Sequence, residues 1–366
     1  MPALRLMLAA WLCAGLFAQA PPAPQAPAQP TDSQQPDTAR FTGGVEVVVA
    51  PVTVVDRDGN YVDGLLPGQF HLYDNDKEQK ISVDVAFPLM SMVIAIQAND
   101  RVESILPQIQ RAGAMIQPIV TGEQGEVAIV AFDSRIRRMQ EFTSDPAKIA
   151  AALKKIQAGS SQSRMIDAVD DAVRQLRTRA PNRRRILLLV TETRDKSSEG
   201  RPREALILAQ LSNVSVYTVD ISRMVTSIMA PADPGRPDNR PPAMTPLPSG
   251  VPATPNTVMQ ATGSIGSSAQ FVPLMVEIFK DVKSIFVDSP AELFAKGTGG
   301  QQFGFVRQRG LEDAIQHIGA ELHSQYLISY NPSNKDEGGF HQISVEVDGR
   351  KDVKARTRPG YWLAAK

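Results

Sequence analysis

The sequence is almost free of cysteine and carries no net charge. Its one cysteine, Cys13, lies close to the N-terminus, so the rest of the chain can form no disulfide within itself. The 39 acidic side chains balance the 39 Lys and Arg side chains, and a chain without a net field does not concentrate nucleic acid or an anionic membrane at its surface. A partner must therefore be recognised through local shape and chemistry.

The familiar arrangements of catalytic and metal-binding residues are also missing. The four histidines are scattered, and no two of them have the spacing of a zinc motif. The serines at 160, 161 and 163 lack a Gly-x-Ser-x-Gly context, and Gln97-Ala98-Asn99 stands where a dinucleotide-binding enzyme would carry its glycine-rich turn. We therefore expect no enzymatic activity, and we rank a hydrolase last among the interpretations.

Long apolar runs are absent except at the N-terminus. Arg5 is followed by the apolar run Leu6 to Phe17 and then by Ala18-Gln19-Ala20, which is the layout of a secretory signal peptide over residues 1–20. We expect an exported protein, periplasmic or extracellular, with no transmembrane anchor after signal removal. A lipid-modified Cys13 is disfavoured because Trp11 and Leu12, which are not small, precede it.

The remaining chain divides by composition into four parts. Residues 21–42 are rich in Pro, Ala and Gln and predict an extended tether. Three further segments follow: an N-terminal β segment at 43–87, an α/β domain at 88–325 and a C-terminal β segment at 326–363. Because a lone hairpin is marginal in water, we expect the two β segments to combine into one small β layer, with the α/β domain inserted between them.

Buried strands alternate with amphipathic helices in the central segment, which predicts a doubly wound, mostly parallel α/β sheet. The expected strands are Met92–Ile96, Val127–Phe132, Ile186–Val190 and Val214–Val219. The expected helices are Val102–Ile116, Pro146–Ile156, Met165–Leu176, Arg203–Leu211, Pro290–Lys296 and Leu311–Leu322, and Gly297 to Gly300 is read as a helix stop. A proline-rich insertion at about 228–258 precedes an amphipathic pattern at Phe271–Phe286, which either packs on its own domain or docks a partner.

Three segments of this domain resemble the metal-facing loops of a von Willebrand factor A domain. They are the polar loop after Met92–Ile96, the turn that contains Ser163, and Thr191-Glu192 after Ile186–Val190. Flanking segments, among them Gln325 to Tyr330 and Arg358 to Tyr361, resemble an uncharacterised branch of exported bacterial proteins related to this family. The resemblance covers about Val45 to Trp362 and implies a Rossmann-like fold.

In the family, an Asp-x-Ser-x-Ser loop, a Thr and an Asp hold a divalent ion to which a partner's carboxylate binds. Read onto this sequence, Gln97 replaces the Asp, and Asn99 and Arg101 replace the two serines. Ser163 stands for the Thr and Glu192 for the final Asp. A guanidinium about 4 Å from a divalent ion costs on the order of 8 kcal/mol at an effective dielectric near 20, so the metal site is degenerate in the interpretation that we favour.

Three alternatives remain open at this rim of Gln97, Asn99, Asp100, Arg101, Ser163 and Glu192. In the first, Arg101 fills the metal position and pairs with Glu192, so that no cofactor is needed. In the second, the loop is merely solvated and Arg101 points away, which leaves Asp100 free to act as a displaced ligand. In the third, Mg²⁺ or Mn²⁺ binds in an atypical way.

The resemblance implies a non-enzymatic interaction module of the adhesion type. Ligands of open α/β sheets bind at the carboxyl ends of the strands, and this preference does not depend on the metal. We expect a protein or glycan partner outside the cytoplasm. The alternative is a structural or envelope-assembly protein in which the A domain is only scaffold.

Overall fold

A computed structural model describes residues 47–84, 89–192, 195, 197–222, 225, 289–304, 308–350 and 352–363. All of them belong to one compact unit, Thr42–Lys366. The expected signal peptide, tether, proline-rich insertion and helix at 271–286 lie outside these residues. Within the described part, no helix is both long and apolar enough to cross a membrane.

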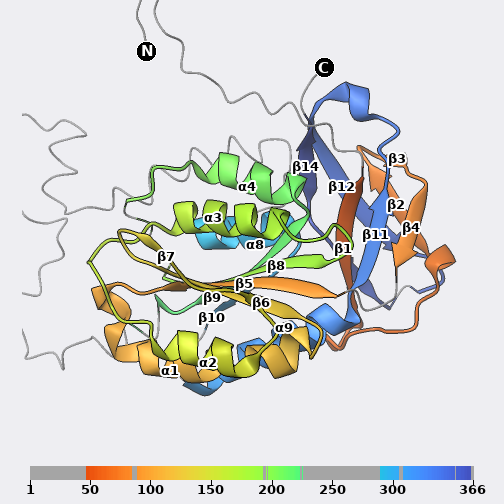
Figure 1. The fold of residues 1–366 in the computed structure, drawn as a ribbon. Helices are drawn as coiled ribbons and strands as arrows, with labels where there is room; N and C mark the ends of the chain where they lie inside the picture. The colour runs from red at the N-terminus through yellow and green to blue at the C-terminus, as the bar shows by residue number, and fades with distance from the viewer. Residues whose placement is uncertain are drawn as a thin grey trace, which may run out of the picture. The chain divides into compact units, whose positions relative to one another are not determined.

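A six-stranded sheet forms the centre of the α/β domain, in the order β10-β9-β8-β5-β6-β7 (Figure 1). Its strands are β5 (Met90–Gln97), β6 (Glu126–Phe132), β7 (Ile136–Thr143), β8 (Arg184–Thr191), β9 (Val214–Asp220) and β10 (Gln302–Gly304). Only the β6–β7 pair is antiparallel; the other neighbours are parallel. The doubly wound, mostly parallel α/β fold expected from the sequence is thus confirmed.

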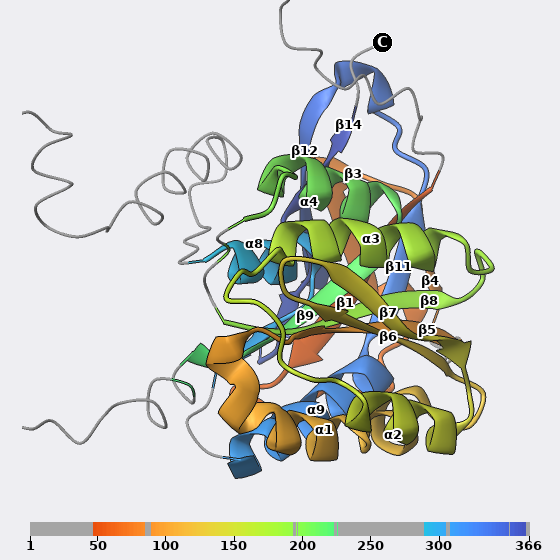
Figure 2. The ribbon, with the colours of Figure 1, turned by 60° about the vertical axis from the view of Figure 1, so that its left-hand side comes forward.

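Helices cover both faces of this sheet (Figure 2). On one face lie α1 (Leu106–Gly113), α2 (Pro146–Lys154) and α9 (Gln308–Ser324), and on the other lie α3 (Met165–Arg177), α4 (Pro202–Leu211) and α8 (Pro290–Thr298). In β5, Met92, Ile94 and Ile96 face the first set, while Val93 and Ala95 face the second. Because successive side chains of a strand point to opposite faces, a strand covered on both sides must be apolar along its central part, as Met92–Ile96 of β5 is.

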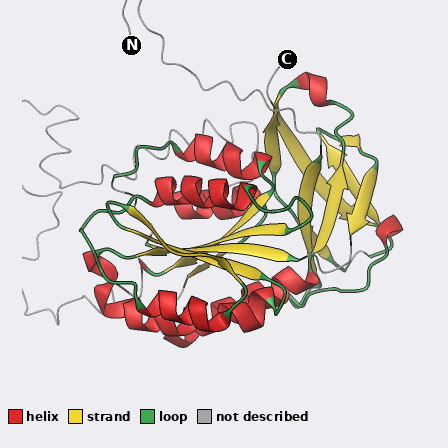
Figure 3. Cartoon of the chain, viewed as in Figure 1, coloured by secondary structure: helices red, strands yellow, loops and turns green. Residues whose placement is uncertain are grey.

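The N- and C-terminal strands associate as expected, but they form two sheets and not one layer (Figure 3). One sheet has the order β13-β1-β11-β4 and the other β14-β12-β2-β3. Their strands are β1 (Val48–Val55), β2 (Phe70–Asp74), β3 (Lys77–Glu78), β4 (Ile81–Asp84), β11 (Tyr326–Tyr330), β12 (Gly339–Val347), β13 (Lys354–Arg356) and β14 (Gly360–Leu363). The two sheets share one apolar core, and we call them together the β module. Each sheet has one apolar face. Packed against each other, the two sheets bury both faces, whereas a single layer would leave its apolar face exposed to water.

Pro51 does not interrupt β1, although a proline cannot donate a hydrogen bond within a sheet. β11 pairs with Val48–Val52, whereas β13 on the other side of β1 pairs only with Thr53–Val55. Proline is tolerated where a strand has no second neighbour that needs its N–H. β1 can therefore run through Pro51 as one strand.

The single α-helix expected at Val102–Ile116 is wrong, because this part of the chain forms separate helical segments. The chain makes a 3₁₀ helix at Asp100–Ile105, then α1, and then a π turn at Gln117–Thr121. Pro107 lies in the first turn of α1 and Pro118 in that of the π turn. A proline provides no N–H to the preceding turn but suits the first turn of a new helix, so each one starts a new segment.

Strands β3, β7, β10 and β14 were not expected from the sequence. β7 forms the antiparallel edge of the sheet and buries none of its residues completely, so it lacks the alternating apolar pattern of a half-buried strand. β10 has only three residues, and β14 four. The stop at the end of α8 is confirmed, because Gly299 caps this helix in the left-handed conformation at φ 82°.

A buried carboxylate joins the α/β domain to the β module. Glu321 of α9 is fully buried, and its Oε1 atom accepts hydrogen bonds from Tyr217 Oη of β9 at 2.9 Å and from Arg356 Nη2 of β13 at 2.6 Å. The same oxygen accepts from Thr53 Oγ1 of β1 at 3.3 Å and from Gln325 Nε2 at 3.1 Å. Side chains of both parts of the unit thus meet at one atom.

Candidate functional site

The rim identified in the sequence lies at the carboxyl ends of β5, β6 and β8. Gln97 is the last residue of β5 and Thr191 the last of β8, and these two parallel strands are direct neighbours in the sheet. Phe132 ends β6 and pairs with Gln97. The loops that follow these strands therefore start side by side, at the edge where open α/β sheets bind ligands.

The Gln97 amide is held by hydrogen bonds at both of its ends. Its Oε1 atom accepts from the backbone N of Glu192 at 2.9 Å and lies 2.8 Å from Thr191 Oγ1. Its Nε2 atom donates to Asn99 Oδ1 at 3.1 Å. Because a backbone N–H can only donate, the amide oxygen must be the atom that faces Glu192. Gln97 thus links the loops after β5 and β8.

Arg101 and Glu192 form the ion pair that we expected. Arg101 Nε lies 3.1 Å from Glu192 Oε1 and 2.9 Å from Oε2. The Glu192 side chain is 4% exposed and that of Arg101 is 38% exposed, so a buried carboxylate is neutralised by a cation that reaches the surface. The alternative in which Arg101 points away is wrong. Whether these residues bind a partner remains a prediction.

The other rim residues are placed differently. Asn99 and Ser163 are buried, at 2% and 1% exposure, and Asp100 is exposed. The Ser163 Oγ atom has no hydrogen-bond partner among the described residues. Side-chain hydrogen bonds therefore join Gln97 to Asn99 and Arg101 to Glu192, whereas no side-chain hydrogen bond joins Ser163 or Asp100 to these four among the described residues.

Asp133, which sequence reasoning missed, organises the neighbouring loop after β6. It is 4% exposed, and its carboxylate accepts from the backbone N of Arg135 at 2.8 Å and of Ser160 at 3.3 Å. A Cβ atom at position 159 would lie 1.6 Å from Asp133 Oδ2, so only glycine allows this approach. The signal in the sequence was Asp133-Ser134, a polar pair directly after a buried strand.

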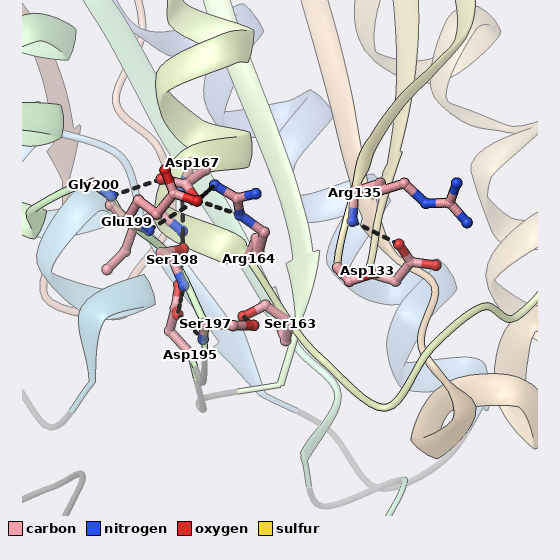
Figure 4. A network of polar contacts seen from close by, with 12 residues as sticks. Asp133, Arg135, Ser163, Arg164, Asp167, Asp195, Ser197, Ser198, Glu199 and Gly200 are labelled. Atoms are coloured by element: carbon pink, nitrogen blue, oxygen red, sulfur yellow. Dashed lines mark hydrogen bonds and ion pairs between the residues drawn. The ribbon is translucent and has the colours of Figure 1, made fainter.

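A second missed carboxylate, Asp195, caps the start of α3 (Figure 4). Its Oδ2 atom accepts from the backbone N of Ile166 at 2.9 Å and from Ser198 Oγ at 2.6 Å. This helix has no capping side chain of its own, because Arg164 occupies its N-cap. A residue far along the chain thus satisfies an N–H group that is usually capped locally.

Asp167 fastens the same loop to the first turn of α3. It accepts from the backbone N of Gly200 at 2.8 Å and of Glu199 at 3.1 Å, and it pairs with Arg164 Nε at 2.7 Å. The hydrogen bond that Arg164 donates to Asp167 raises the pKa of Arg164 above its ordinary value. The negative groups near this helix start lie where the helix dipole favours them.

Comparison with known proteins identifies the domain. Residues 96–194 match the sequence model of the von Willebrand factor type A domain. Residues 96–194 of the α/β domain are thus similar to a von Willebrand factor type A domain, and we call the α/β domain the A domain. The match includes every rim residue from Gln97 to Glu192, so the rim belongs to the A domain itself. No curated protein sequence matches the chain.

Solved structures show partial likeness to the fold. An aerotolerance-related membrane protein from Bacteroides fragilis is 15% identical, with a TM-score of 0.38 over 64% of this chain and 98% of that one. The conserved hypothetical protein BatB from Bacteroides thetaiotaomicron is 16% identical, with a TM-score of 0.32 over 36% and 66%. Proximal thread matrix protein 1 from the mussel byssus is 11% identical, with a TM-score of 0.42 over 75% and 50%. The chain thus spans 66% of BatB and half of the byssus protein.

Among the described residues, no group of three or more His, Cys, Asp and Glu side chains is arranged to hold a metal ion. Two of the oxygen ligands expected at the rim, those of Glu192 and Gln97, are already engaged. Glu192 is bound by Arg101, and the Gln97 oxygen is bound by the Glu192 backbone. This donor set does not fit the divalent ion that the family resemblance implies, because a fixed guanidinium stands beside its buried carboxylate, Glu192.

Proposed function

We propose that this chain is an exported, non-enzymatic interaction module of the adhesion type, whose A domain binds a partner without a divalent metal. The observation that carries the proposal is the Arg101–Glu192 pair, with Nε–Oε2 at 2.9 Å. It joins the loops after β5 and β8, which are the loops that a bound ion joins in the family. A charge-assisted bond can fix two loops as an ion does.

Burial supports this interpretation of the pair. Glu192 is 3% exposed and would be costly to leave without a partner, so Arg101 has a structural reason to stay in place. The Gln97 and Asn99 amides are neutral and bonded to each other, which leaves little negative charge to attract a cation. The rim is therefore organised by the protein's own side chains.

A hydrolytic role has less support. The one buried rim hydroxyl, Ser163 Oγ, makes no hydrogen bond to a histidine or carboxylate of the described residues, so it has no base to activate it. The export of the protein rests on the apolar N-terminal segment, and its site of action is periplasmic or extracellular. A protein or glycan outside the cytoplasm is the proposed partner.

Calorimetry with Mg²⁺ and Mn²⁺ tests the metal-free rim. We expect no saturable heat at micromolar metal for the full chain, and the same result for the variant Arg101→Lys. Saturable micromolar binding, abolished by Glu192→Gln, contradicts the proposal.

The second candidate is a structural or envelope-assembly protein in which the A domain is scaffold. The Glu321 junction favours it, because this buried contact holds the β module firmly to the A domain. Capture of envelope proteins by the full chain separates the two candidates. Arg101→Gln and Glu192→Gln abolish capture if the rim binds the partner, and leave it unchanged if the β module does.

A further inference from the structure

Strand β4 forms one edge of the sheet β13-β1-β11-β4. It pairs with β11 along one side, and no strand of the described residues pairs with its other side (Figure 1). The pairing with β11 runs without a register shift. Its apolar side chains, Ile81 and Val83, pack against the core of the β module but are only partly buried. At this regular edge strand, the core therefore stays partly open to water.

Each other sheet edge in the described part of the chain has a feature that hinders pairing with another chain. β3 has two residues, and both are charged. β10 and β13 have three residues each, and β7 has two register shifts in its pairing with β6. α4 packs against β14, with the Arg203 guanidinium 4.7 Å from the centre of the Trp362 ring. β4 has neither a bulge nor such a cover among the described residues, and its one charged residue, Asp84, stands at its end.

The direction of the backbone groups of β4 follows from β1. Asn213 Oδ1 accepts from the backbone N of Val49 at 3.4 Å, so this N–H points away from β11. Backbone groups alternate in direction along an antiparallel strand, so Pro51 points the same way, and it has no N–H to donate. Ala50 lies between these two and must bond to its partner on β11, Ile328.

The same alternation continues across β11 to the edge of the sheet. Since Ile328 bonds to β1, Ser329 must bond to its partner on the other side, Ser82 of β4. Ile81 and Val83, on either side of Ser82, then direct their backbone N–H and C=O groups outward. These outward groups have no hydrogen-bond partner among the described residues. The edge thus offers two residues that can each exchange a pair of backbone hydrogen bonds with another strand.

We propose that β4 pairs with β4 of a second copy of this chain, antiparallel and about a two-fold axis at Ser82. In this register Ile81 lies opposite Val83 of the second copy, so the outward backbone groups meet and apolar side chains stand side by side. Lys80 lies opposite Asp84 at both ends of the pair, and both side chains are exposed. Each outward backbone group and each charge therefore meets its complement in the same register.

The contact is small and lies on the β module, so it is independent of the A-domain rim. Two four-residue strands bury little surface, and we expect a weak, reversible dimer. An exposed apolar side chain near the edge favours the same contact. The 3₁₀ turn Pro67–Gln69 packs next to β4, and Leu66, which precedes this turn, is 66% exposed. Covering Ile81, Val83 and Leu66 adds hydrophobic stabilisation to the backbone hydrogen bonds.

Sedimentation velocity of the full chain over a range of concentrations tests the pairing. We expect an equilibrium between monomer and dimer. Lys80→Glu should weaken the dimer about tenfold, because the two-fold axis brings the reversed charge against Asp84 twice. Asp84→Lys should weaken it similarly, and the combined variant should restore it, since opposite charges face each other again. Lys77→Glu is the matched control, because it reverses an exposed charge of β3 outside the pair and should change nothing.

A cysteine at the two-fold axis gives a second readout. Cys13 belongs to the expected signal peptide, so Ser82→Cys introduces the only thiol of the mature chain. Residues that face each other without backbone hydrogen bonds in an antiparallel pair have Cα atoms about 4.5 Å apart, which a disulfide can bridge. Mild oxidation should therefore give a covalent dimer. Ser344→Cys should not, because exposed Ser344 lies in β12, which has a neighbouring strand on each side.

Thermal melting checks that each variant is folded, and the cysteine variant keeps the test valid if a charge reversal unfolds the chain. A chain that stays monomeric at every concentration overturns the inference, and so does a monomer that binds an extended segment of another protein at β4. A dimer that neither single charge reversal weakens uses another surface and also overturns it. If the combined variant stays as weak as the single ones, the register about Ser82 is wrong. All these outcomes leave the proposed function of the rim standing.

Discussion

The Glu321 junction predicts a measurable coupling between the β module and the A domain. Replacing Arg356 by Met removes the cation that is hydrogen-bonded to Glu321 and retains a flexible apolar stem. The variant leaves a carboxylate that is 0% exposed with only neutral donors, from Tyr217, Thr53 and Gln325. Its second oxygen, Oε2, has no hydrogen-bond partner among the described residues.

The size of the effect follows from burial. Removing one partner of a fully buried pair costs about 3–5 kcal/mol, because the other charge is stranded. The Arg356 side chain is 36% exposed, so water already screens part of the attraction, and we expect about 2–3 kcal/mol for Arg356→Met. Glu321→Gln keeps the shape and strands no buried charge, and we expect about 1 kcal/mol.

Urea unfolding followed by two probes measures both the loss and the coupling. Trp362 lies in β14, and the other tryptophan, Trp11, belongs to the expected signal peptide, so fluorescence of the mature chain reports on the β module. Far-UV circular dichroism reports mainly on the helices, which belong to the A domain. We expect coincident transitions in the wild type and separate transitions in Arg356→Met.

A double-mutant cycle with Glu321→Gln gives the energy of the pair itself. A coupling of about 1–2 kcal/mol is expected, since the double variant strands no charge. If Arg356→Met unfolds within about 0.5 kcal/mol of the wild type and its two transitions still coincide, Glu321 does not couple the two parts and the reasoning is refuted.

Three further predictions concern the A domain. The combined variant Gln97→Asp, Asn99→Ser and Arg101→Ser restores the oxygen ligands of the family and removes the guanidinium. Calorimetry should therefore detect Mg²⁺ binding by this variant, but not by the control variant Arg101→Ser. If the combined variant binds no Mg²⁺, another feature of the rim excludes the ion. Asp195→Ala removes the cap of α3 and should lower the free energy of unfolding in urea by about 1 kcal/mol. Asp195→Asn should lower it less, because its amide oxygen can still accept from Ile166 N. Equal losses in the two variants would show that Asp195 does not stabilise α3 as a cap. Burial tends to raise the pKa of Glu126, but bonds from Arg179 and Ser91 and the charge of Arg183 outweigh it and lower this pKa. Glu126 therefore stabilises the fold fully above its unfolded pKa near 4.5 and loses that contribution as pH falls through the folded value, so Glu126→Gln should flatten the loss of stability in an acid titration below about pH 5. An unchanged acid slope would contradict this assignment.

Strongly periodic segments were predictable because their pattern is local. The apolar run Met92–Ile96 and the amphipathic run Met165–Leu176 lie within β5 and α3 as expected. Segments without such a pattern were missed: β7 is half-buried along its length, and its pairing with β6 holds it as a strand. Pro107 divided the helix expected at Val102–Ile116, although the periodicity had suggested continuity.

In the candidate site, too, some residues were predicted from the sequence and others were missed. The resemblance to the A domain named Arg101 and Glu192, and their contact followed from opposite charge at positions that the family brings together. Asp133 and Asp195 were not found, because the contacts that tie them to other loops, with Ser160 and Ile166, lie 27 and 29 residues away and nothing local marks these partners.

The sequence by itself determined the order of strands and helices, the parallel sheet and the position of the rim at its carboxyl edge, because these depend on periodicity, turn residues and the handedness of the crossovers. The tertiary structure alone decided that the terminal strands form two sheets over one core, that Glu321 joins them to the A domain, and which rim charges face inward. Pairing of distant strands and burial of charge depend on which surfaces meet, and no local pattern in the chain encodes this.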